Sequence, residues 1–401
     1  MSGGVKNVLV TGGSGFVGLH VVRALVAANH RVRATVREFG NTDCVLPLEQ
    51  NMAKARYPVE LFEADLLDDR GWAQAMEGIE FVIHIAGPPS TLGDALVDDH
   101  AACVRLAVEG TMRVLTFAKG AGTVRRVVLV SAAGAVHGSS EGDEELLYDE
   151  SYYTNLKGAN VPIFYRSKAM AEAAAWNFAE SHSLDLAVIC PSFVLGPVLS
   201  DRVNASVDLI RMMLEGTPKL VPPLALAICD VRDLADSLVR AMQAPAAANT
   251  RVLVNTCTLW LHDMAAVLKD HFGPLGYHIN RAKLPSYLRP FLGVVSQQMN
   301  VYKPLLNKMF RFSNDRMKDV LGVLPRSCVD TIVDTARSLV EFEVVRRTGR
   351  YHLLMKTASA GDGSGGTSPV LQNEETLSEA KETSARDPPS TLACSFVKKM
   401  K

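Results

Sequence analysis

The stretch Thr11-Gly12-Gly13-Ser14-Gly15-Phe16-Val17-Gly18 decides how the rest of this 401-residue sequence is interpreted. It follows a short β-branched run and opens a helical pattern over residues 17–28, so its glycines fall at a strand-to-helix turn. Gly12 permits a tight turn, Gly15 lets a pyrophosphate approach the backbone, and Gly18 allows the helix to pack closely on the strand. Free N–H groups at the start of such a helix bind phosphate. The stretch therefore predicts a dinucleotide-binding site.

Short β-branched runs alternate with helical patterns in the first half of the chain. The expected strands are 8–10, 32–36, 59–62, 81–85, 127–130 and 186–189, and the expected helices are 17–28, one beginning at 72–76, 98–121 and 167–181. This order predicts an α/β protein with a Rossmann-type doubly wound parallel sheet and a smaller irregular α/β lobe. We expect a dinucleotide-binding domain over 5–195 plus about 225–256, a substrate-binding lobe over about 196–224 plus 257–350, and a disordered tail over 357–401.

Composition narrows the classes of partner. The 42 Lys and Arg residues balance 43 Asp and Glu residues, and only 6% of residues are aromatic, which argues against nucleic-acid binding. Seven scattered cysteines and no secretory signal predict reduced thiols and no metal site. No apolar run reaches the length of a membrane span, so at most a segment over 287–295 is expected to touch a membrane surface. A cytoplasmic location is expected, and Lys398-Lys399 leaves the endoplasmic-reticulum surface as the alternative.

Further motifs follow the glycine stretch in a fixed order. They are RATVR at 33–37, Asp65-Leu66, HIAGP at 84–88, RVVLVS at 126–131, SKAMAE at 167–172, PSFVLGP at 191–197 and DVRDLA at 230–235. Together they resemble the extended short-chain dehydrogenase/reductase superfamily, also called the NAD-dependent epimerase/dehydratase superfamily, in its dihydroflavonol reductase/cinnamoyl-CoA reductase branch. The resemblance implies an NAD(P)-dependent oxidoreductase that acts on the CH–OH or carbonyl group of a small or medium apolar substrate. It also suggests a homodimer formed through the helices at 98–121 and 167–181.

The choice between NADP and NAD depends on Arg37, which ends the second expected strand beside the adenosine ribose. An arginine there pairs with a 2′-phosphate, so NADP is predicted and NAD is the alternative. Related reductases often have a second basic residue shortly afterwards, but none occurs here before Lys54. By resemblance, Asp65 accepts from the adenine amino group. The full predicted cofactor-binding set is Thr11, Gly12, Gly15, Phe16, Val17, Gly18, Arg37, Asp65, Leu66, Ala86, Lys168 and Pro191.

The catalytic positions depart from the family pattern, which has a tyrosine four residues before a lysine. Lys168 fits, but Phe164 stands four residues before it and the tyrosine is Tyr165, about 100° further around a helix. A π-bulge or an unwound first turn would restore the tyrosine to its place.

The serine that holds the substrate oxygen is displaced as well. Ala132 and Ala133 occupy its usual places, and Ser131, one or two residues early, is expected to face the opposite side of the strand. His137 offers a substitute with a pKa suited to proton transfer near pH 7. The catalytic candidates are Lys168, Tyr165, Ser131 and His137. The alternatives are a catalytically impaired NADP-binding scaffold or sensor, and an epimerase/dehydratase or 3β-hydroxysteroid-dehydrogenase-like enzyme.

Overall fold

The structure is a computed structural model that describes residues 4–88, 100–138, 144–158, 161–285 and 305–354. The chain divides into two compact units, one through Arg346 and one from Arg347 onward. The fold below is that of the first unit. The tail predicted over 357–401, the segment 287–295 and the Lys398-Lys399 pair lie outside the described residues.

A seven-stranded parallel sheet forms the centre of the first unit, with the strand order β10-β7-β5-β4-β1-β2-β3. Its strands are β1 (Asn7–Thr11), β2 (Arg31–Val36), β3 (Glu60–Glu63), β4 (Phe81–His84), β5 (Arg126–Val130), β7 (Leu186–Pro191) and β10 (Thr250–Val254). The order reverses direction beside β1, which is where doubly wound sheets bind their ligands. The predicted α/β class and doubly wound parallel sheet are confirmed.

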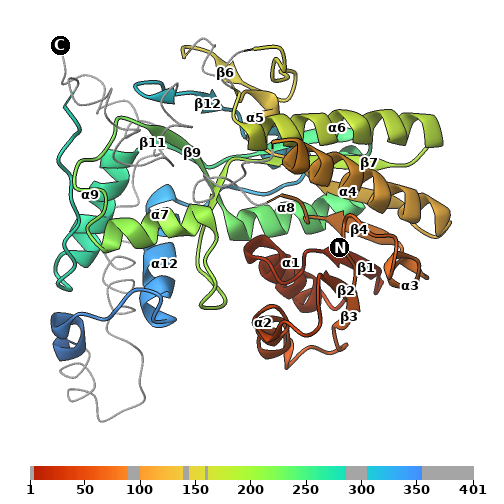
Figure 1. Ribbon diagram of the computed structural model, residues 1–401, viewed down its shortest axis with the longest axis horizontal. Helices are drawn as coiled ribbons and strands as arrows, with labels where there is room; N and C mark the ends of the chain where they lie inside the picture. The colour runs from red at the N-terminus through yellow and green to blue at the C-terminus, as the bar shows by residue number, and fades with distance from the viewer. Residues whose placement is uncertain (1–3, 89–99, 139–143, 159–160, 286–304, 355–401) are drawn as a thin grey trace, which may run out of the picture. The chain divides into compact units, whose positions relative to one another are not determined.

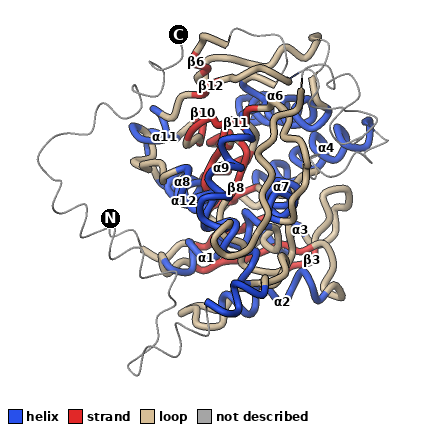
Figure 2. The backbone as a smooth tube through the Cα atoms, turned by 90° about the vertical axis from the view of Figure 1, so that its left-hand side faces the viewer, coloured by secondary structure: helices blue, strands red, loops and turns tan. Residues whose placement is uncertain are grey.

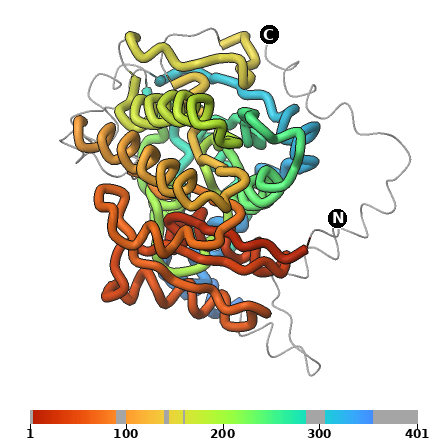
Figure 3. The backbone as a smooth tube through the Cα atoms, turned by 90° about the vertical axis from the view of Figure 1, so that its right-hand side faces the viewer, coloured from red at the N-terminus to blue at the C-terminus, as the bar shows by residue number. Residues whose placement is uncertain are grey.

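Helices cover both faces of this sheet, as the strands (red) and helices (blue) of Figure 2 show. Side chains alternate between the two faces of each strand, so Val8 and Val10 join one buried core and Leu9 joins the other. The first core is covered by α1 (Phe16–Ala27) and α8 (Val231–Gln243), and α2 (Thr42–Met52) adds Leu48 and Met52. The second core is covered by α3 (Trp72–Met76), α4 (His100–Gly120) and α6 (Ile163–His182), of which α4 and α6 lie side by side in Figures 1 and 3.

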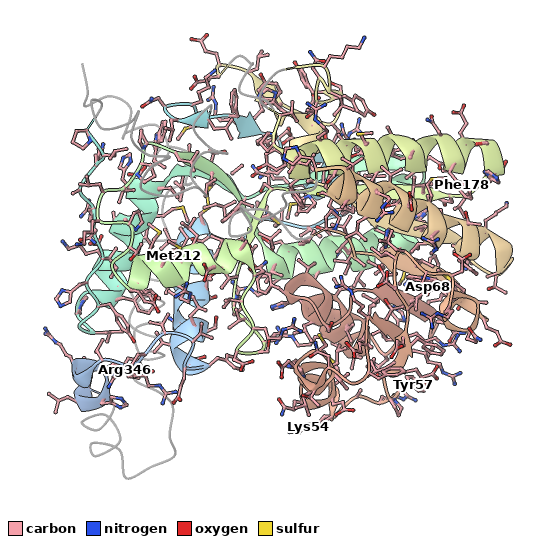
Figure 4. All side chains as sticks on the ribbon, viewed as in Figure 1. Lys54, Tyr57, Asp68, Phe178, Met212 and Arg346 are labelled. Atoms are coloured by element: carbon pink, nitrogen blue, oxygen red, sulfur yellow. A yellow bond between two sulfur atoms is a disulfide. The ribbon has the colours of Figure 1, made fainter. Side chains whose placement is uncertain are left out.

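A smaller sheet begins where the chain leaves β7. It contains β8 (Phe193–Leu195), β9 (Ala225–Asp230) and β11 (Cys257–Trp260), in the order β11-β9-β8. Around it lie α7 (Ala205–Leu214), α9 (Leu261–Phe272) and α12 (Cys328–Glu341), as Figure 1 shows. The remaining elements are α5 (Ala133–Val136), β6 (Leu147–Tyr148), η1 (Pro245–Ala247), β12 (Arg311–Phe312), which pairs with β6, and α11 (Asp315–Asp319). In Figure 4, Met212 marks α7 and Phe178 marks α6.

The cysteines correct one prediction. Cys257 at the start of β11 and Cys328 at the start of α12 form a disulfide across 71 residues of sequence, with 6.6 Å between their Cα atoms. The prediction of reduced thiols throughout is therefore wrong for this pair, because folding places two distant cysteines within bonding range. Cys103, Cys190 and Cys229 are buried free thiols, and Cys44 is a half-buried one.

Candidate functional site

The glycine turn between β1 and α1 has a shape that only small residues permit. Gly12 has a φ of +68°, and a Cβ atom on Gly18 would overlap the carbonyl oxygen of Gly12. Gly15 is different, because an added Cβ would meet only that same oxygen, at an ordinary 3.4 Å. Gly15 is the N-cap residue of α1 and gives the helix no side-chain cap. The protein's own packing therefore leaves space beside Gly15 and free N–H groups in the first turn of α1, which fits a bound pyrophosphate.

Thr11 ties the turn to the neighbouring strand. Its hydroxyl lies 2.7 Å from Nδ1 of His84 and accepts from the backbone N–H groups of Ile85 and Ala86, each at 3.1 Å. Burial, together with the charge of Lys168, lowers the pKa of His84 to about 3, so its imidazole is neutral. These contacts fix the carboxyl ends of β1 and β4, which form the floor of the site.

A groove of about 910 Å³ runs across this edge of the sheet. Its lining includes Gly12, Gly15, Phe16, Val17, Gly18, Arg37, Asp65, Leu66 and Ala86, all of them in the predicted cofactor set. Nε of Arg37 lies 3.9 Å from Oδ2 of Asp65, and the Arg37 side chain is 79% exposed. The other Asp65 carboxylate oxygen accepts from the backbone N–H of Leu67 at 2.7 Å, so Asp65 also stabilises its own loop.

A second cavity of about 280 Å³ adjoins the groove. The two share Val17, Ile85, Pro88 and Asn204 in their linings. The rest of the second cavity is largely apolar and includes Phe164, Phe193, Leu226, Leu305, Phe310 and Phe312. Tyr165, Lys168, Ser131, His137 and Pro191 also line it, so all the predicted catalytic residues meet at one cavity.

Tyr165 reaches this cavity from a regular helix. The helix α6 is α-helical from Ile163 onward, so neither a π-bulge nor an unwound turn restores Tyr165 to the usual place. The Tyr165 ring instead lies against Gly134 of α5, where an added Cβ would overlap Cδ1 and Cγ of the ring. Burial raises the pKa of Tyr165. Its hydroxyl remains a protonated phenol that donates to no residue in the described part of the chain.

Lys168 lies one turn further along α6. Its ammonium donates to the carbonyl oxygen of Val130 at 3.0 Å and stands 6.0 Å from the centre of the Phe164 ring. Burial lowers the pKa of Lys168 to about 8, while the nearby Cys190, Cys103 and Glu172 oppose that shift. The lysine is therefore charged at neutral pH and is poised to lose its proton a little above it.

Ser131 lines the cavity, but its hydroxyl belongs to a buried polar cluster. Its hydroxyl donates to the carboxylate of Glu172, whose other oxygen lies 2.6 Å from Nε of Arg251 on β10. The side chains of Glu172 and Arg251 are 2% and 4% exposed. Trp176 also donates to Glu172, at 3.4 Å. In this arrangement the Ser131 hydroxyl is occupied by Glu172, while Ala132 and Ala133 stand buried at the start of α5.

His137 is held by aromatic packing. Its ring stacks on Tyr148 with 4.2 Å between centroids and meets the edge of Phe310 at 4.4 Å. Burial, helped by the charge of Lys308, lowers the pKa of His137 to about 4. The prediction of a pKa near 7 is therefore wrong, because a stacked and desolvated imidazole holds a proton poorly. The imidazole is neutral at pH 7.

Comparison with known proteins now identifies the family. The family model described as "NAD dependent epimerase/dehydratase family" matches residues 8–256. The chain belongs to this family. Dihydroflavonol 4-reductase from Zea mays is 28% identical over 92% of this chain and 96% of its own length. Cinnamoyl-CoA reductase 1 from Petunia hybrida is 33% identical over 83% of this chain and 92% of its own length. The resemblance drawn from the ordered motifs is confirmed.

Solved structures agree with the fold of this epimerase/dehydratase family member. The Candida albicans Gre2 complex with NADPH superimposes with a TM-score of 0.69 at 25% identity, covering 84% of this chain and 99% of the Gre2 chain. The yeast methylglyoxal/isovaleraldehyde reductase Gre2 complexed with NADPH superimposes with a TM-score of 0.70 at 23% identity, covering 84% and 100% of the two chains. Sequence reasoning missed Gly134 and the Glu172–Arg251 pair, because both depend on contacts between distant segments.

Proposed function

We propose that this protein is an NADP-dependent reductase acting on a carbonyl group in a small or medium apolar molecule. The observation that carries the proposal is the junction of the two cavities. A glycine-floored groove with space for a pyrophosphate opens into an aromatic-lined cavity, and Lys168 and Tyr165 line that cavity. Its relatives are reductases of dihydroflavonol and cinnamoyl-CoA substrates, which supports a carbonyl carried on an apolar body.

Some residues of the chain would bind the cofactor and others would transfer the proton. The free N–H groups in the first turn of α1 would hold the pyrophosphate, Arg37 a 2′-phosphate, and Lys168 the nicotinamide ribose. When bound, the nicotinamide supplies a hydride to the carbonyl carbon. Tyr165 is the described side chain best placed to give a proton to the oxygen, since its protonated phenol lines the cavity. Ser131 does not share this role, because its hydroxyl donates to Glu172.

The test is a comparison of turnover with cofactor affinity in two variants. Tyr165→Phe removes the proton donor and no phosphate contact, so turnover should fall by about 10²–10⁴ while the NADPH Kd stays within about threefold. Lys168→Ala should lower turnover and also raise the NADPH Kd, because the lysine would contact the nicotinamide ribose and lines the cavity where the reaction takes place. Calorimetry that detects no dinucleotide binding to the folded wild type would refute the proposal.

A scaffold or sensor without turnover is the second candidate, favoured by Phe164, Ala132 and Ala133 at the usual tyrosine and serine places. NADPH binding without turnover on any aldehyde, ketone or alcohol would support it. Phe164→Tyr combined with Ala132→Ser would then be the matching gain-of-function test. His137→Ala should leave turnover within a few-fold of wild type, since the imidazole is neutral and packed between aromatic rings.

We also propose an oligomeric state and a cellular location for the protein. We place a homodimer contact on α4 and α6, the two adjacent helices that cover one face of the central sheet, and sedimentation velocity would measure it. None of the described helices has the length and apolar character needed to cross a membrane. The proposed location is cytoplasmic, and fractionation of cells with and without Lys398→Ala and Lys399→Ala would separate it from the endoplasmic-reticulum surface.

A further inference from the structure

A second arginine faces the groove from a distant part of the chain. Arg202 lies between β8 and α7, and it lines the groove together with Arg37, Asn41 and Cys44. The sequence offered no second basic residue close after Arg37. The structure brings one from 165 positions further along to the lining of the same groove.

Two sets of contacts fix Arg202 against the start of α2. Its guanidinium donates to the Sγ atom of Cys44 at 2.9 Å and to the carbonyl oxygen of Asp43 at 3.3 Å. Further along α2, the amide of Asn51 donates to the carbonyl oxygen of Leu199 at 2.9 Å. The segment that carries Arg202 is therefore attached to α2 at two points, and α2 directly follows the loop after Arg37.

The charge of Arg202 is not neutralised by a carboxylate among the described residues. Its partners are a thiol and a backbone carbonyl, both neutral and both replaceable. Of the acidic residues on this groove, Asp208 is already paired with Arg211 at 2.5 Å. A phosphate monoester carries nearly two negative charges at neutral pH, more than one exposed arginine balances.

We propose that Arg202 is a second determinant of 2′-phosphate recognition, acting together with Arg37 on the same groove. The inference rests on the proposed use of NADP. Arg37 directly follows a strand of the nucleotide-binding sheet and Arg202 belongs to the chain segment leading to α7, so the phosphate would contact both parts of the chain. Selectivity for NADP over NAD then depends on both.

The experiment measures Kd for NADPH and NADH in wild type, Arg202→Gln, Arg37→Gln and the double variant. Arg202→Gln should raise the NADPH Kd about fivefold to tenfold and leave the NADH Kd within twofold. The matched control is Arg125→Gln, which removes the same charge at the opposite, amino-terminal edge of the sheet and should change neither. The NADPH dependence on ionic strength should also weaken in Arg202→Gln.

Cys44 gives an independent readout, because it contacts Arg202 and lines the same groove. NADPH should slow alkylation of Cys44 by a maleimide, followed by peptide mass spectrometry, more than saturating NADH does. An equal rise of the NADPH and NADH Kd values in Arg202→Gln, or no change in either, would leave the selectivity unchanged and would overturn the inference. If wild type binds neither dinucleotide, the proposed function itself fails, which is a distinct result.

Discussion

Replacing Gly134 by alanine tests whether the position of Tyr165 is the one that supports catalysis. An alanine Cβ would overlap Cδ1 and Cγ of the Tyr165 ring, whereas carbon atoms in contact are normally about 3.5–4.0 Å apart. The ring must therefore move by more than about 1 Å or α5 must shift. Overpacking of this kind costs about 1–3 kcal/mol of unfolding free energy.

The effect on turnover should be larger than the effect on stability. A proton donor works within about 2.6–3.2 Å of its acceptor, so a displacement of more than about 1 Å takes the phenol out of reach. We expect Gly134→Ala to lower kcat/KM for NADPH-dependent reduction by about 10²–10⁴, with the NADPH Kd within about threefold. The assay is NADPH oxidation followed by absorbance, with calorimetry for the Kd and thermal unfolding for stability.

Two controls make the result decisive. Gly120→Ala, at the end of α4, adds a Cβ with no heavy atom within 4 Å and should behave as wild type. In a Tyr165→Phe background, Gly134→Ala should cost little further turnover, because the group it displaces is already gone. Wild-type turnover in Gly134→Ala, or an undiminished loss in the Tyr165→Phe background, would refute the argument that the ring position over Gly134 carries catalysis.

Three further predictions concern binding, pH and stability. Gly15→Val should abolish NADPH binding with little change in melting temperature, because the added Cβ meets no backbone atom closely. Gly18→Ala should lower both the NADPH affinity and the melting temperature, because its Cβ collides with the backbone at Gly12 and Gly13. Equal losses of stability in the two variants would contradict this distinction. NADPH affinity should fall as pH rises through about 8, because Lys168 loses its charge there, and Lys168→Arg, which stays charged, should remove that inflection. Reduction of the Cys257–Cys328 disulfide should destabilise the fold by about 2–4 kcal/mol and lower the melting temperature by several degrees, and the double serine variant should show no response to reductant.

The sequence predicted the parallel sheet because its information is local. Buried strands such as β5 and β7 are continuous β-branched or apolar runs, and the glycine turn needs residues within a few positions of one another. The helix α2 was missed, since it contains Pro47 and carries only three buried residues. The strands β10 and β11 were also missed. β11 reverses direction to pair with β9, which no local pattern reveals.

The residues of the candidate site also fall into two groups, those that the local sequence predicts and those that only the tertiary fold brings together. The cofactor groove was predictable, because its glycines and Arg37 lie at the ends of adjacent strands. The displacement of Tyr165 was visible in the spacing, but its accommodation was not, since that depends on Gly134, which lies 31 positions earlier. The pKa of His137 depends on its packing against Tyr148 and Phe310, and Arg202 reaches the groove only through the tertiary fold.

The pairing of Glu172 with Arg251 sets a lower limit on the length of chain that can make this site. Glu172 shares α6 with Lys168 and Tyr165, and the carboxylate is buried. Arg251 lies on β10, the last strand to join the sheet. A fragment that ends before β10 would leave that carboxylate without its counter-ion and β7 without its neighbour at the sheet edge. We therefore expect the smallest piece of this chain that binds a dinucleotide to include β10, even though every residue that lines the groove lies before position 209.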